Sequence, residues 1–170
     1  MPERGGVRVT GVLILLAVAL GVADSLLPRP VPFMKIGLAN VPAVVSAVRL
    51  GMRRTLALNT ARSLTVALIT GSLATPAFLM SMAGAAASAV IMSAASRGYP
   101  GLFSMTGVSI CGACASLWGQ LAVAAAVLPG LPVGALAFPV SLWGIGTGAV
   151  VGLAAGLLED RLEHVNILSR

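Results

Sequence analysis

The sequence predicts an all-α polytopic membrane protein, a bundle of about six transmembrane helices, and composition is the first reason. Of its 170 residues, 58% are hydrophobic and only 9% are charged, and the mean hydropathy is +1.00. A soluble domain carries roughly 25% charged residues, so we expect the outer surface to face lipid. A transmembrane helix takes about 20 apolar residues, which leaves room for about six. We expect one transmembrane domain over residues 1–170, with cytoplasmic tails at about 1–7 and 159–170.

Proline and glycine divide the chain into its apolar segments. Proline ends a helix because it removes a donor and clashes one turn back, and glycine adopts the dihedral angles that turns need. The second segment is short, and we expect it to be tilted or partly re-entrant. The first resembles a signal peptide, but its apolar run exceeds the usual length of roughly 7–15 residues, so we expect a retained helix. The predicted spans are about 8–27, 39–52, 55–74, 76–96, 104–128 and 136–158.

The basic residues predict the orientation. The net charge is +6, but the basic residues are scattered singly and form no aromatic-interleaved patch of the kind that binds nucleic acid. Cytoplasmic loops of membrane proteins are enriched in Lys and Arg. With both termini in the cytoplasm, the outer connections hold only Arg29 and Lys35. We therefore expect a multi-pass protein of the cell membrane with both ends inside. The inner segments then hold Arg4, Arg8, Arg49, Arg53, Arg54, Arg97, Arg161 and Arg170.

Small residues recur at helical spacing in two predicted spans. In lipid, helices associate through close approach of such residues. The last span has a glycine at every fourth position, which predicts a face for packing against a neighbouring helix. In the first span, Ala19 and Ala23 fit either internal packing or docking of another membrane subunit. The glycines of the last span are Gly144, Gly148, Gly152 and Gly156.

Polar side chains within the spans gather at one predicted depth. Polar groups in hydrocarbon are costly and mark pathways or sites. We expect a substrate pocket that opens to the outer face, with Gln120 on a helical stripe that includes Ser109 and Ser116. Other roles remain open: Asn40 as a helix cap, Asp24 paired with Arg29 or Lys35, Ser81 bonded to its own backbone, and Gln120 bonded between helices. The predicted site residues are Asp24, Lys35, Asn40, Ser81, Ser109, Ser116 and Gln120.

Three further groups have structural interpretations. We expect Arg62 to extend toward the inner headgroups, or to pair with carbonyl or anionic groups, rather than to contact a ligand in an outward-open pocket. Cys111 and Cys114 lack the two further ligands that zinc needs, which favours small-residue packing and no metal site. The acidic residues 159–163 are expected to form a solvated helix end.

The chain shows no catalytic constellation. It has no G-x-x-x-x-G-K-[ST] loop for ATP phosphates. Its only aspartates, Asp24 and Asp160, lie far apart in sequence, so no aspartate pair is available to hold magnesium against a diphosphate. We expect a protein that is not an enzyme on its own and that needs no cofactor.

Several segments of the sequence resemble the motifs of one protein family. The run 35–40 reads Lys-Ile-Gly-Leu-Ala-Asn and resembles the K-x-G-L-A-N signature of the Gx transporter family, also labelled heptaprenyl diphosphate synthase component I. The resemblance covers about residues 24–155. It continues through Arg62, Ser81–Gly84 with Ser88 and Met92, Gly107–Ser109 with Gly112–Ala113, Gly119–Gln120, and Thr147–Gly148 with Gly152.

The resemblance implies a fold similar to the six-helix S components of energy-coupling factor transporters. Those proteins bind a micronutrient near the outer face and dock on a transmembrane coupling protein with paired ATPases, through a small-residue motif that Ala19 and Ala23 would match. One departure concerns the ligand: Ser116-Leu117 stands where the family is expected to show His-Asn. Asp24 likewise stands where a glutamate is expected.

Two functional hypotheses follow. The first is a substrate-binding subunit that carries a small molecule and works with separate energy-coupling subunits. The second, implied by the older family label, is an accessory membrane subunit of a heptaprenyl diphosphate synthase or a quinone-related isoprenoid system. A structural membrane scaffold is a third possibility. The expected partners are membrane lipid, a coupling protein with ATPases, and a small-molecule or isoprenoid-like ligand.

Overall fold

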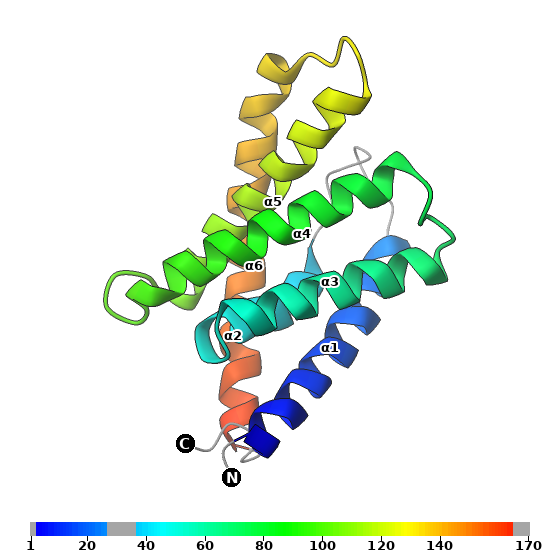
Figure 1. Ribbon diagram of the computed structural model, residues 1–170. Coiled ribbons are helices and arrows are strands. Elements are labelled where there is room, and N and C mark those ends of the chain that lie inside the picture. The colour runs from blue at the N-terminus through cyan, green and yellow to red at the C-terminus, as the bar shows by residue number, and fades with distance from the viewer. Residues whose placement is uncertain (1–2, 27–36, 165–170) are drawn as a thin grey trace.

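The described part of the chain is entirely helical. The structure is a computed structural model that describes residues 3–26 and 37–164, and no strand occurs among them. The start of α1 and the end of α6 lie at the same end of the bundle (Figure 1). The six helices and two short 3₁₀ turns are α1 (Glu3–Leu26), η1 (Leu38–Asn40), α2 (Val41–Arg49), α3 (Met52–Ile69), α4 (Pro76–Ala95), η2 (Ser96–Gly98), α5 (Met105–Val127) and α6 (Val133–His164).

The surface of the bundle is that of a membrane protein. Three helical stretches are long and apolar enough to cross a bilayer: Pro76–Gly98, Met105–Val127 and Val133–Leu162. Their outward faces carry large apolar side chains, such as Phe138 at 76% exposure and Leu157 at 68%. Water would oppose so much exposed apolar area, whereas lipid does not. The predicted helical membrane protein is thus confirmed, while the count of six spans stays a prediction.

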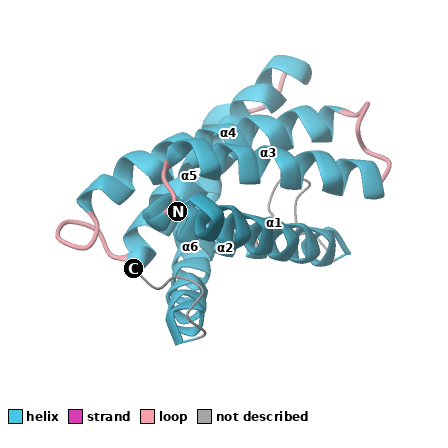
Figure 2. Cartoon of the chain, turned by 60° about the horizontal axis from the view of Figure 1, so that its bottom comes forward, coloured by secondary structure: helices cyan, strands magenta, loops and turns pink. Residues whose placement is uncertain are grey.

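Helix α2 lies at the centre of the fold. It has only nine residues, which gives a length of roughly 14 Å, too short for a hydrocarbon core of about 30 Å. Residues 41–47 are all buried, and α2 contacts each of the other five helices. In Figure 2 it lies between α6 and α1. The Ser46 hydroxyl inside this apolar core accepts a hydrogen bond of 3.1 Å from Thr55 Oγ1 of α3.

Two helix ends differ from the sequence prediction. Helix α3 ends at Ile69 rather than near residue 74, because Gly71 takes a positive φ of 68° and the Ser72 amide turns back to the Ala67 carbonyl. Helix α6 continues to His164 rather than ending near residue 158. Residues 158–163, Leu-Glu-Asp-Arg-Leu-Glu, are mostly good helix formers and include no proline or glycine.

Glycines set the contact between α5 and α6. A Cβ built on Gly148 would stand 2.7 Å from the Ile110 Cα, and one on Gly152 would stand 2.5 Å from the Thr106 Cα. Gly144 faces Cys114 at 3.1 Å in the same way. The predicted glycine row therefore lies against α5 at these three positions. Gly156 has no atom within 4 Å of the corresponding point, because α5 begins only at Met105 and α6 extends past it.

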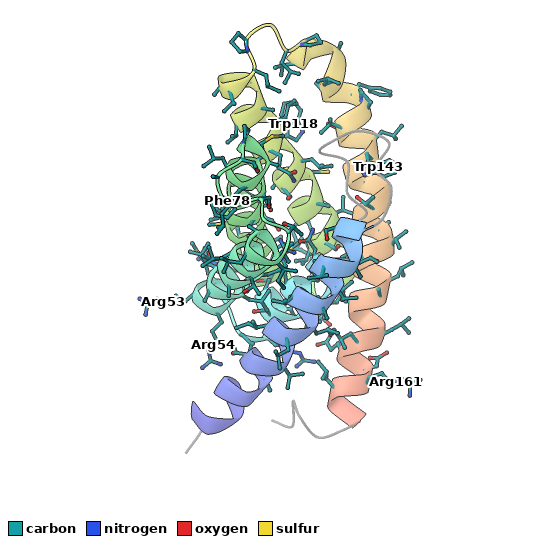
Figure 3. All side chains as sticks on the ribbon, turned by 90° about the vertical axis from the view of Figure 1, so that its right-hand side faces the viewer. Arg53, Arg54, Phe78, Trp118, Trp143 and Arg161 are labelled. Atoms are coloured by element: carbon teal, nitrogen blue, oxygen red, sulfur yellow. The ribbon has the colours of Figure 1, made fainter. Side chains whose placement is uncertain are left out.

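An ion pair joins α2 to α6 at the end where the termini lie. Arg49 Nε donates to Glu159 Oε1, and the Glu159 side chain is only 7% exposed. The expectation of a solvated acidic end is therefore wrong for Glu159. The sequence could not show that the long α6 would bring this carboxylate against the end of α2. Figure 3 places Arg53, Arg54 and Arg161 in the same half of the molecule, with Trp118 and Trp143 in the other.

Candidate functional site

A cavity with a polar lining lies between the helices. Its volume is about 80 Å³. The last turns of α1, the η1 turn, and the middle parts of α3, α4, α5 and α6 contribute to its wall. The residues that line it are Gly21, Asp24, Gly37, Ala39, Asn40, Arg62, Ser63, Val66, Ser81, Ser109, Ala113, Ser116, Leu117, Gln120, Thr147 and Val151.

Most of the predicted site residues meet at this cavity. Residues far apart in sequence come together there because α1, the η1 turn, α4 and α5 converge on one region. Lys35 lies outside the described residues. Whether these side chains bind a substrate is a separate question from their proximity. The predicted residues in the lining are Asp24, Asn40, Ser81, Ser109, Ser116 and Gln120.

The turn before α2 connects to the end of α1. Gly37 has a φ of +81°, a conformation that residues with a Cβ rarely adopt, and its amide donates to Asp24 Oδ2 at 3.3 Å. Asp24 is 5% exposed, so its carboxylate lies in the interior rather than at the surface. The predicted partners Arg29 and Lys35 fall outside the described residues. The G-L-A-N sequence thus places Asn40 beside the end of α1.

Arg62 lines this cavity, and of the two roles expected for it the pairing with a carbonyl or anionic group is the one observed. Its Nη1 donates to Asn40 Oδ1 at 2.7 Å, and the charge of Asp24 acts on its guanidinium. Because α3 ends at Ile69, Arg62 lies closer to the C-terminal end of the helix than the sequence predicted. Its side chain reaches the cavity.

Asn40 does not cap α2. It occupies the N-cap position, but its side chain makes no capping hydrogen bond. Its Oδ1 instead accepts from Arg62. Since guanidinium offers donors only, this bond fixes which end of the amide faces Arg62. The Nδ2 group, a donor, then faces elsewhere.

Gln120 is held by a close crossing of α4 and α5. Its Nε2 donates to Ser116 Oγ at 3.2 Å, one turn earlier on α5. A Cβ on Gly84 of α4 would stand 2.8 Å from the Ser116 carbonyl oxygen and 2.9 Å from Gln120 Cγ. The space that Gly84 leaves is therefore filled by the glutamine. Gln120 bonds within its own helix, and no side chain of another described helix takes its amide.

Two buried hydroxyls beside the cavity lack hydrogen-bond partners. Ser63 is 4% exposed and Ser109 is fully buried, and neither Oγ has a partner among residues 3–26 and 37–164. Ser81 lines the cavity as well, and no hydrogen bond from it to its own helix is present. Buried polar groups are usually satisfied, so these hydroxyls indicate a place where a polar group could be received.

Sequence reasoning missed three polar contributors. Arg62, Ser63 and Thr147 all line the cavity. A charged residue inside a span was a usable signal for Arg62. Ser63 and Thr147 gave no such signal, because a serine or threonine in a span usually bonds its own backbone, as Thr147 Oγ1 does to the Trp143 carbonyl at 2.8 Å.

The other predicted groups lie away from the cavity. Ala19 and Ala23 are exposed on α1, so neither is covered within the described chain. Cys111 and Cys114 are free thiols of intermediate exposure. Among the residues whose positions are described, no group of three or more His, Cys, Asp or Glu side chains is placed to hold a metal ion.

These features define a helical membrane protein with a small polar cavity between its helices, lined in the described part of the chain by one arginine and one carboxylate. The family model for heptaprenyl diphosphate synthase component I matches residues 13–158. The chain therefore belongs to that family. No curated protein matches it, and neither does any solved structure. The predicted similarity to energy-coupling factor S components stays a prediction.

Proposed function

We propose that this chain is a non-catalytic substrate-binding subunit of a transport system in the cell membrane. It holds a small molecule in the cavity between α1, α3, α4, α5 and α6, and separate subunits supply the energy. One observation supports this most directly: Arg62, Asp24 and Asn40 line a cavity inside a lipid-solvated bundle. Ionisable groups inside membrane segments are costly and mark substrate or ion pathways.

The chemistry of the lining favours binding over catalysis. Asp24 is the only carboxylate among the described residues that line the cavity. Prenyl transfer needs paired carboxylates that hold metal ions against a diphosphate, and the lining does not provide them. The polar groups present are instead hydroxyls, amides and one guanidinium, which recognise a ligand without transforming it.

The family assignment favours a second candidate. A family named for component I of a heptaprenyl diphosphate synthase implies a partner subunit. In this alternative the chain is a membrane accessory subunit, and a soluble prenyl synthase performs the reaction. The two candidates differ in the proteins that they retain: a coupling protein with ATPases in the first, a prenyl synthase in the second.

The test is mass spectrometry of small molecules and proteins that co-purify with the detergent-solubilised chain. Three variants are compared with the wild type: Asn40→Ala and Gln120→Leu alter the cavity, and Thr60→Ala changes an exposed position of α3. We expect a small molecule that is retained by the wild type and Thr60→Ala and depleted in both cavity variants. Equal retention in all four preparations would reject a binding role for this cavity.

The co-purifying proteins decide between the two candidates. Recovery of a membrane coupling protein and ATPases supports transport, whereas recovery of a soluble prenyl synthase without them supports the accessory role. The amounts of coupling protein, ATPases and prenyl synthase recovered are compared with those from a preparation of an unrelated helical membrane protein made in the same cells.

A further inference from the structure

We infer that the cavity receives the carboxylate group of a small, singly charged ligand on Arg62, and that it favours this group over a diphosphate. This inference rests on the proposed function and names the chemical class of its ligand. Three properties of the cavity carry it: the hydrogen-bond donors on and around Arg62, its size, and its charge.

The donors come first. A guanidinium has five N–H groups and accepts no hydrogen bonds. Among the described residues, Arg62 forms one hydrogen bond, from Nη1 to Asn40. The edge formed by Nε and Nη2 has no partner there. That edge is the one that binds a carboxylate side-on through two parallel hydrogen bonds.

Neighbouring groups offer further donors. Asn40 Oδ1 accepts from Arg62 and keeps a second lone pair, while the Nδ2 group of the same amide is a donor. The hydroxyls of Ser63 and Ser109 are buried without partners in the described part of the chain, and each can donate. A ligand that satisfies such groups must bring acceptors, and a carboxylate brings two oxygens with about four lone-pair sites.

Size limits what can enter. An engineered cavity of about 150 Å³ holds one benzene molecule. The 80 Å³ of this partly open cavity suits a group the size of a carboxylate with its first carbon, or at most a single phosphate. The rest of a larger ligand, including the second phosphate of a diphosphate, would extend outside this space.

Charge separates the two groups that fit by size. The lining has one guanidinium, Arg62, and one carboxylate, Asp24, whose charge acts on that guanidinium. Before a ligand binds, the formal charge of the described lining is thus close to zero. Each negative charge that a ligand brings is then an excess charge in a low-dielectric interior, which is unfavourable. A carboxylate brings one negative charge and costs least, whereas phosphate and diphosphate each bring more.

The test measures the thermal unfolding midpoint of the full chain in zwitterionic nanodiscs with defined anions. The probes are acetate, octanoate, inorganic phosphate and inorganic diphosphate. Chloride at matched ionic strength and octanol, which lacks the carboxylate, are controls. A ligand that binds only the folded state raises the midpoint, by about 3–6 °C at about ten times its dissociation constant for a chain of this size. The variants are Arg62→Gln, Arg62→Lys and, as an exposed arginine for comparison, Arg97→Gln.

We expect a carboxylate probe to raise the midpoint of the wild type and of Arg97→Gln. The shift disappears in Arg62→Gln and is reduced in Arg62→Lys, which folds with a positive charge but lacks the two-donor edge. Acetate and octanoate acting equally supports a soluble ligand, and octanoate acting alone supports a ligand with an apolar tail in the lipid.

Three results would overturn the inference: a larger Arg62-dependent shift with phosphate or diphosphate, a carboxylate shift that persists in both Arg62 variants, or no shift with any probe. The outcome that rejects this ligand class differs from the outcome that rejects the proposed binding function. A co-purifying molecule without a carboxylate, released by Asn40→Ala, would uphold a binding role and reject this ligand class.

Discussion

Arg62 of α3 donates from Nη1 to Oδ1 of Asn40 across 2.7 Å, and this bond joins the middle of a helix to the turn before the central helix α2. Asn40 follows Gly37, whose amide in turn binds Asp24 of α1. The two contacts connect α1, the turn and α3 around the cavity. The arrangement makes Asn40 a structural support of the cavity as well as part of its wall.

Replacing Asn40 by alanine is expected to destabilise the protein. The change leaves a half-buried Arg62 donor without its acceptor, which costs about 1 kcal/mol, the lower end of the range for a buried group. Thermal unfolding in detergent should show a lower midpoint for Asn40→Ala than for the wild type. Thr60→Ala, on the exposed side of α3, is the matched control and should leave the midpoint nearly unchanged. An unaltered midpoint for Asn40→Ala would mean that the bond contributes nothing to stability.

The glycine row of α6 provides a second prediction. Gly152→Ala places a methyl group 2.5 Å from the Thr106 Cα, and the two backbones must separate, at a cost of about 1–3 kcal/mol. Gly156→Ala lies in the same row with open space around it and should stabilise the helix by up to about 1 kcal/mol. Comparing the unfolding free energies of the two variants tests the packing directly. Equal effects would show that α5 and α6 do not approach at Gly152.

The spacing of residues allowed part of this site to be predicted. Ser109, Ser116 and Gln120 are spaced by seven and four residues, close to two turns and one turn of an α-helix, so they had to share a face of α5, and the structure turns that face toward the cavity. The apolar composition likewise sufficed to predict a helical membrane protein. The first inference depends on helical periodicity and the second on composition, and the sequence contains both in full.

The position of a side chain along its helix and the contacts between residues far apart in the chain could not be predicted from the sequence. The place of Arg62 depends on where α3 ends, and that depends on backbone angles at Gly71. The pairing of Glu159 with Arg49 depends on the register of two helices that are far apart in the chain. Gly156 fits the glycine row by spacing, yet its contact depends on where the facing helix begins. Such features follow from tertiary packing and leave no periodic signal.

The ion pair between α2 and α6 yields a third prediction. Glu159→Gln removes the charged partner of Arg49 from a buried position, and a charge-assisted hydrogen bond contributes about 1.5–3 kcal/mol. The part of Arg49 that remains exposed reduces the expected loss to about 1–2 kcal/mol. Asp160→Asn alters the adjacent exposed carboxylate and should change the unfolding midpoint little. A similar loss in both variants would indicate general charge effects instead of this pair.

The orientation in the membrane can be tested by chemical labelling. In a background with both native cysteines replaced by alanine, Ala74→Cys lies in the turn between α3 and α4, and Arg53→Cys lies at the start of α3; both positions are exposed. With cytoplasmic termini, a membrane-impermeant maleimide added to intact cells should label position 74 and not position 53. Lysed cells, in which both should react, are the control. The reverse pattern would place the cavity on the cytoplasmic side and remove the basis for an outward-open site.

The exposed face of α1 gives the last prediction, which concerns partner binding. Ala19 and Ala23 are exposed on one side of α1, near Leu15 at 73% exposure. Leucine at these positions meets no other part of the described chain, so Ala19→Leu and Ala23→Leu should leave expression and the unfolding midpoint unchanged. If another membrane subunit docks there through close helix contact, both variants should co-purify with less of it. Gly146→Leu adds the same bulk to an exposed position of α6 and should retain the partner. Loss of expression in the α1 variants would instead assign this face to packing within the chain.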